Sequence, residues 1–217
     1  MSWKFWKSLL AYILQRRKMT KQSAAKAPYP PGDFAIWIII YVELVTFGLL
    51  FVGYVFSRRA DIELFNASQL LLNQTSGFVN TLILITSSYF IVKAVQSIKN
   101  MTKHTLMQAN DTASKWLLSA MFLGLAFLII KIVEFSHIFG AGITLSTNTF
   151  FMFYLLLTMF HFMHVILGII ILWNIYQKTK TKGYSTDDHS GIETGASYWH
   201  LVDLLWIVLF PLVYIIR

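Results

Sequence analysis

Three pairs of ionisable residues at i, i+3 spacing are the part of this sequence that could do chemistry. The pairs are Glu134 with His137, His161 with His164, and His200 with Asp203. Residues three apart lie on one face of a helix, and each pair falls in an apolar stretch of membrane-spanning length. An Asp, Lys or Arg at the centre of a bilayer is unfavourable by about 2.5–3.5 kcal/mol. The pairs therefore need a shared polar interior or a partner.

Two more ionisable residues lie within the apolar stretches. Glu43 follows Asp33, which can cap the first helix, and a rise of about 1.5 Å per residue places Glu43 close to mid-membrane. We interpret Glu43 either as a protonated carboxyl bonded to a neighbouring helix or as a proton acceptor near a proton path. Lys131 precedes Glu134 by one helical turn, so the two can neutralise each other within one helix.

The two later pairs differ in what they predict. His161 and His164 fit an interhelical hydrogen-bond cluster, a metal site or a proton relay, because a neutral imidazole both donates and accepts. Asp203 lies about 8 Å beyond Tyr198, too deep for its carboxyl to reach water easily. We therefore expect Asp203 to form a buried pair with His200.

A metal site is the enzymatic alternative. Glu134 and His137 fit the Glu-x-x-His pattern of di-iron bundles, and the other carboxylates and imidazoles could supply further ligands. Expected depth opposes one compact site: His137 falls near the outer face, His161 at the centre and His200 near the inner face, whereas ligands lie within about 2.0–2.2 Å of a metal. The alternative functions are a stand-alone membrane metalloenzyme and a proton- or ion-conducting protein.

Composition indicates an integral membrane protein. The chain has 217 residues, of which 56% are hydrophobic and 13% charged, whereas soluble domains are about 25% charged. Five stretches reach the roughly 20 apolar residues that a membrane-spanning helix needs, which predicts an all-α integral membrane bundle of five transmembrane helices. The predicted spans are about residues 34–57, 78–98, 116–138, 149–174 and 198–216.

Basic residues are concentrated on one side of these spans. Of the 18 Lys and Arg residues, 14 fall in residues 1–27 or in and around the second and fourth connections. The positive-inside rule then places the N-terminus in the cytoplasm and the C-terminus outside. We attribute the net charge of +8 to topology and to anionic lipid, and expect no nucleic-acid partner. The absence of cysteine excludes disulfides and thiolate metal sites.

The first 32 residues differ from the rest of the chain. Apolar residues from Trp3 to Leu14 recur at helical spacing among basic residues, which predicts a short amphipathic helix on the cytoplasmic surface. A proline-containing linker completes residues 1–32, and residues 33–217 are expected to form one five-helix membrane domain.

Ordered motifs along residues 30–217 resemble subunit III of haem–copper oxidases, the cytochrome c oxidase subunit III family. The motifs are Glu43, residues 80–88, Glu134, Phe150-Phe151, His161-x-x-His164-x-x-x-Gly168 and Tyr198-Trp199-His200-x-x-Asp203-x-x-Trp206. Within that family, residues 31–34, 65–67, 145–148 and 206–211 are most similar to the NorE-type protein associated with nitric oxide reductase.

The resemblance implies an accessory subunit without its own redox centre, in an oxidoreductase complex of the bacterial cytoplasmic (inner) membrane. Its partner would be the catalytic subunit of a haem–copper oxidase or nitric oxide reductase, which it would stabilise in aerobic or denitrifying electron transport. The resemblance implies no haem, copper or other cofactor, and membrane phospholipid as a bound ligand.

Two features depart from the family pattern. The chain has five predicted spans, as quinol-oxidase-type subunits do, whereas the mitochondrial type has seven, and the missing pair forms one wall of the lipid cleft. Lys131 is not part of the general pattern. We interpret the three spaced pairs as separate structural contacts between helices, and Glu43, alone on its helix, as a functional carboxyl.

Overall fold

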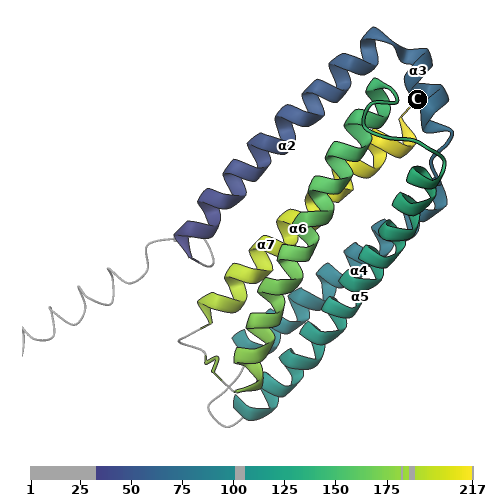
Figure 1. Cartoon of the computed structure of the whole chain (residues 1–217). Coiled ribbons are helices and arrows are strands. Elements are labelled where there is room, and N and C mark those ends of the chain that lie inside the picture. Colours follow the sequence, from purple (N-terminus) through teal and green to yellow (C-terminus); the bar gives the residue numbers. More distant parts are fainter. Residues whose placement is uncertain (1–32, 101–105, 182, 186–188, 217) are drawn as a thin grey trace, which may run out of the picture. The chain divides into compact units, whose positions relative to one another are not determined.

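The computed structural model describes residues 33–100, 106–181, 183–185 and 189–216, and every regular element among them is helical. The predicted amphipathic helix and linker, residues 1–32, lie outside the described residues. The elements are α2 (Phe34–Ala60), α3 (Ile62–Gln69), α4 (Gln74–Lys99), α5 (Leu106–Gly140), α6 (Thr149–Lys180), α7 (Ser190–Phe210) and a π-helical turn η1 (Pro211–Ile215) (Figure 1).

The five predicted spans are confirmed, because α2, α4, α5, α6 and α7 with η1 are each long and apolar enough to cross a membrane. Several helices extend beyond the predicted bounds. The third begins at Leu106 instead of residue 116, the fourth continues to Lys180, and the fifth begins at Ser190 instead of residue 198. Their polar ends continue past the apolar window that hydropathy detects. The short helix α3 was not predicted.

Side-chain caps fix where three spans begin. The Asp33 carboxylate accepts from Ala35 N, as predicted, at 3.3 Å. Asn73 and Asn148 cap α4 and α6 in the same way, accepting from Ser76 N at 3.1 Å and Phe151 N at 2.9 Å. Each cap satisfies a backbone donor that the first turn of a helix leaves unpaired.

Helices α4, α5, α6 and α7 pack side by side in antiparallel order, with α4 also against α7, and α2 packs on α6 and α7 (Figure 1). The buried side of α7 carries Trp199, whose indole lies between two glycines. A Cβ added at Gly124 would lie 2.8 Å from this ring, and one at Gly168 would lie 2.9 Å from it. Small residues at these positions therefore let α5, α6 and α7 approach closely.

The C-terminal turn is held by two amides from α3 and the start of α4, which lie at the same end of the bundle (Figure 1). Gln69 Nε2 donates to Val213 O at 2.7 Å, and Gln74 Nε2 donates to Tyr214 O at 2.7 Å. These bonds satisfy carbonyl groups that the end of a helix leaves free. Pro211 begins this turn, and the turn directs Tyr214 into the interior, where it is fully buried.

Candidate functional site

A buried ion pair with two tyrosines forms the most polar part of the interior. Lys131 Nζ lies 3.1 Å from Glu134 Oε2 and donates to the Tyr214 hydroxyl at 2.6 Å. Glu134 Oε1 accepts from the hydroxyl of Tyr154 at 2.6 Å and from that of Tyr214 at 2.5 Å. The intrahelical pair predicted from sequence is present, and α6 and η1 complete it.

Aromatic rings surround the Lys131 ammonium group. Its nitrogen lies 4.8 Å from the centre of the Trp206 ring and 5.1 Å from that of Tyr214. Phe135 and Tyr154 each lie 5.8 Å from it. A cation over an aromatic face is stabilised by about 0.5–2 kcal/mol, most when water is excluded. The cage therefore adds to the ion pair in making a charge tolerable at this depth.

Glu134 also reaches a side pocket of about 450 Å³ between the start of α4 and the last turns of α5. The walls are largely Leu and Ile side chains, and the polar groups are Asn73, Ser76, Glu134 and His137. His137 is exposed and has no hydrogen bond or ion pair among the described residues. Of the interhelical contact expected for this pair, Glu134 makes its part through the two tyrosines, whereas His137 lines the pocket and makes no such bond.

His161 is fully buried beside this cluster, but it is not part of a hydrogen-bond cluster. Its ring packs edge-on against Phe127 at 5.7 Å and tilted against Trp206 at 5.2 Å between ring centres. Neither ring nitrogen has a hydrogen-bond partner among the described residues. The interhelical hydrogen-bond cluster expected for the two histidines therefore does not include His161, and the side chains of His161 and His164 turn towards different helices.

His164 instead pairs with Glu43, joining α6 to α2. Its Nε2 lies 3.0 Å from Glu43 Oε2, and its Nδ1 lies 2.7 Å from the Phe160 carbonyl. A carbonyl oxygen can only accept, so Nδ1 carries a hydrogen. The contact with Glu43 then needs one more proton, held either by the carboxyl or by Nε2. Glu43 is therefore half of an interhelical pair, in line with the interpretation as a carboxyl bonded to a neighbouring helix, and it is not an isolated carboxyl.

The third pair lies at the contact of α4 with α7. His200 Nδ1 is 2.6 Å from Ser88 Oγ but 3.6 Å from Asp203 Oδ2. The closer partner of His200 is thus a serine on another helix, and its contact with Asp203 is longer than a hydrogen bond. The Asp203 carboxylate accepts no hydrogen bond from the residues that the structure describes.

The residues considered for a metal do not converge. Within the described ranges, no three His, Asp or Glu side chains are placed to hold an ion together. Glu134 binds its tyrosines, Glu43 binds His164, and His200 lies at the α4–α7 contact.

Sequence reasoning missed the hydroxyl partners of these groups, chiefly Tyr154, Tyr214 and Ser88. One signal was available for the tyrosines, because a tyrosine inside an apolar span needs a partner for its hydroxyl. Spacing alone could not identify that partner, since Tyr214 and Glu134 are 80 residues apart.

Comparison with known proteins identifies similar sequences over nearly the whole domain. The sequence model described as "Cytochrome c oxidase subunit III" matches residues 36–217. Cytochrome c oxidase subunit 3 of Synechocystis sp. is 36% identical over 141 residues, which cover 64% of this chain and 55% of that relative. The chain thus spans about half the length of that relative.

Two other relatives extend over more of the chain. Cytochrome bo(3) ubiquinol oxidase subunit 3 of Buchnera aphidicola subsp. Schizaphis graminum is 28% identical over 184 residues, which cover 84% of this chain and 92% of the relative. Heme-copper oxidase subunit I+III of Aeropyrum pernix is 26% identical over 197 residues, which cover 87% of this chain and 23% of the relative.

Proposed function

This chain belongs to the cytochrome c oxidase subunit III family, and we propose that it is a non-catalytic subunit of a respiratory haem–copper oxidase that packs against the catalytic subunit and stabilises it. The observation that carries the proposal is the family match over residues 36–217. The interior supports it, since Glu134, Lys131 and Glu43 are bonded to other side chains of the bundle. Their capacity for hydrogen bonds is directed inwards, as expected of groups that hold helices together.

The relative from Aeropyrum pernix supports a place beside a catalytic subunit. Its name joins subunits I and III, and the part that resembles this chain is 23% of it. In a polypeptide that joins the two subunits, the covalent chain keeps the subunit III-like segment next to subunit I. We propose that the present chain takes the corresponding place non-covalently, in electron transport in the bacterial cytoplasmic membrane.

The catalytic subunit of a nitric oxide reductase is the second candidate partner. Two of the segments that resemble the NorE-type protein, residues 65–67 and 145–148, lie at the same end of the bundle. Asn148 Nδ2 donates to Ser68 Oγ at 2.9 Å, and Arg58 Nη2 donates to Asn66 Oδ1 at 3.2 Å. These bonds join α2, α3 and the start of α6 into one surface, and we propose that this surface distinguishes between the two partners.

Membrane phospholipid is the proposed ligand. The pocket of about 450 Å³ beside Glu134 is lined mostly by apolar side chains, together with the polar residues His137, Asn73 and Ser76. That arrangement suits an acyl chain below a headgroup. Native mass spectrometry of the purified protein would show bound phospholipid as discrete mass additions.

Co-purification from native membranes tests the proposed function. An affinity-tagged chain is expected to retain a haem–copper catalytic subunit, identified by mass spectrometry and by its haem spectrum, whereas a tagged unrelated membrane protein is not. Retention of a nitric oxide reductase catalytic subunit instead would favour the second candidate.

The chain purified alone tests the alternatives. A stoichiometric metal or haem would contradict a subunit without its own redox centre and favour the metalloenzyme. Proton flux into liposomes that contain only this chain would favour the conducting protein.

A further inference from the structure

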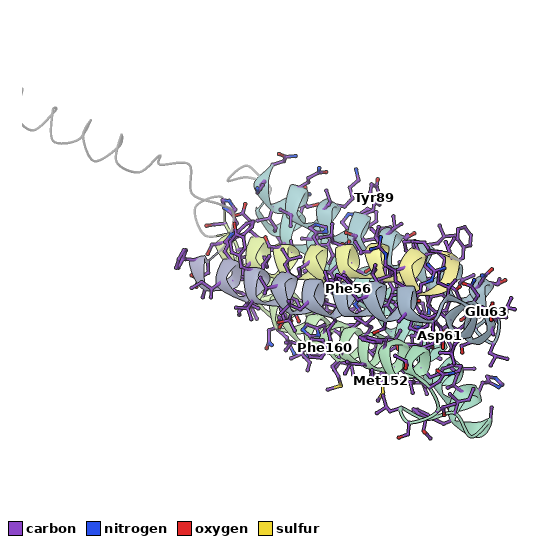
Figure 2. The ribbon with its side chains drawn as sticks, turned by 90° about the horizontal axis from the view of Figure 1, so that it is seen from above. Phe56, Asp61, Glu63, Tyr89, Met152 and Phe160 are labelled. Carbon is purple, nitrogen blue, oxygen red and sulfur yellow. The ribbon has the colours of Figure 1, made fainter. Side chains whose placement is uncertain are left out.

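We propose that the catalytic subunit docks on the α4–α7 seam, the surface around Ser88, His200 and Asp203, through a membrane helix that donates a hydrogen bond to these groups. This inference rests on the proposed function and adds the surface and the chemistry of the contact. Figure 2 looks onto this side of the bundle, where α7 lies between α2 and α4.

The seam is polar and accessible at the same time. The His200 side chain is 38% exposed, and the neighbouring Asp203 side chain is 11% exposed. Around them on α7 the outward residues are apolar, including Leu204, Ile207 and Val208. A polar group thus interrupts a surface that otherwise suits hydrocarbon.

Depth excludes water and lipid headgroups as ready partners. The ion pair of Lys99 with Glu193, 2.6 Å long, marks the end of α4 and the first turn of α7. Counted from this ion pair at about 1.5 Å per residue, His200 lies roughly 10 Å and Ser88 roughly 16 Å deeper. Half of the hydrocarbon core is about 15 Å thick, so the seam lies well inside it. This is deeper than the position near the inner face expected from sequence, because α7 begins at Ser190 and not at residue 198.

The chain leaves hydrogen-bonding capacity unused at this depth. His200 Nδ1 meets Ser88 Oγ, but Nε2 has no hydrogen-bond partner among the described residues. Asp203 accepts no hydrogen bond there either, and its nearest cation is His200 at 3.6 Å. An unsatisfied polar group in hydrocarbon is unfavourable by several kcal/mol. A donor from outside the chain would remove that penalty.

Other exposed polar residues in the spans differ in this respect. The hydroxyls of Thr86, Ser119 and Ser136 donate to carbonyls of their own helices at 2.7–3.0 Å. His137 lies one turn from the end of α5, within reach of the interface. The seam is therefore the place where an intramembrane imidazole reaches the surface beside a nearly buried carboxylate, and both have hydrogen bonds unmade. A protein helix can carry a donor to this depth, which singles it out as the occupant.

Site-specific photo-cross-linking in the assembled complex tests the location. Benzoylphenylalanine is introduced at Leu204, next to the seam, or at Leu167 on α6 as a control; these side chains are 50% and 47% exposed. We expect cross-links to the catalytic subunit from Leu204 and lipid adducts from Leu167. Cross-links to the catalytic subunit from Leu167 but not from Leu204, or only lipid adducts from Leu204, would overturn the docking surface while leaving the proposed function intact.

Substitution tests the chemistry. His200→Leu and Asp203→Asn, compared with Leu167→Ala, are expected to reduce the fraction of catalytic subunit retained by about tenfold, as for a hot-spot contact. Thermal unfolding of each variant chain alone separates lost docking from lost folding. The proposal would be overturned if both seam variants kept their unfolding temperature and retained as much catalytic subunit as the unaltered chain does. If the unaltered chain itself retains no catalytic subunit, the proposed function fails and the docking surface with it.

Discussion

Lys131 brings a positive charge into the interior, where its side chain is 1% exposed. Three kinds of contact compensate for the lost water: the Glu134 carboxylate, the Tyr214 hydroxyl and the surrounding aromatic rings. A buried ion pair is of little net benefit over a well-packed apolar pair. Removing one partner is different, because it leaves the other charge buried and uncompensated.

Lys131→Met is therefore expected to destabilise the isolated chain by about 3–5 kcal/mol. The double variant Lys131→Met with Glu134→Gln should recover most of that loss, because no charge is then left unpaired and the amide oxygen can still accept from the tyrosine hydroxyls. Chemical or thermal unfolding in detergent, arranged as a double-mutant cycle, measures the coupling. A double variant as unstable as the sum of the single ones would show that the two side chains act independently.

Glu43 permits a sharper test, because one proton is shared in its contact with His164. Glu43→Gln should fold as well as the unaltered chain, since the amide can donate to Nε2 in place of the carboxyl. Glu43→Leu should lose about 1–3 kcal/mol, because Nε2 is left unsatisfied. Unfolding midpoints compare the two directly. Equal destabilisation by Gln and Leu would mean that the acidic proton itself is needed for the fold.

Among the elements, α7 makes contacts with α2, α4 and α6 and positions the interior groups. Its Trp199 is fully buried against Gly124 and Gly168, and the indole of its Trp206 donates to Thr81 Oγ1 at 3.0 Å. The turn that follows α7 then places Tyr214 on the ion pair. Helix packing and the polar interior thus depend on the same contacts, so a substitution that disturbs the packing is expected to disturb the polar interior as well.

Gly168→Ala tests this dependence. The new Cβ would lie 2.9 Å from the rigid Trp199 ring, and such overpacking should destabilise the chain by about 1–3 kcal/mol. Gly48→Ala is the matched control, since a Cβ there meets nothing within 4 Å. The control should be neutral or slightly stabilising, because alanine favours a helix by up to about 1 kcal/mol over glycine. Unfolding midpoints decide, and equal values for both variants would contradict a tight α6–α7 contact.

For the whole molecule, the five spans were predictable because an apolar stretch of that length has few alternatives in a membrane. The start of α5 was placed ten residues too late, since residues 106–115 include Asn110, Asp111 and Lys115 and lack the hydropathy of a span. The pair of Lys131 with Glu134 was predictable because the two residues are one helical turn apart in the sequence. The pairs of Glu43 with His164 and Ser88 with His200 were not, because they depend on which helices become neighbours.

Topology across the membrane remains a prediction from charge, and the absence of cysteine makes it straightforward to test. Ser146 and Lys180 are both exposed, and they flank the two ends of α6. With 14 of the 18 basic residues expected from sequence on the Lys180 side, the positive-inside rule predicts Lys180 in the cytoplasm and Ser146 outside. In intact cells, a membrane-impermeant maleimide should label Ser146→Cys and leave Lys180→Cys unlabelled until the membrane is permeabilised. The opposite pattern would mean that the contacts with a partner, and not the basic residues, set the orientation.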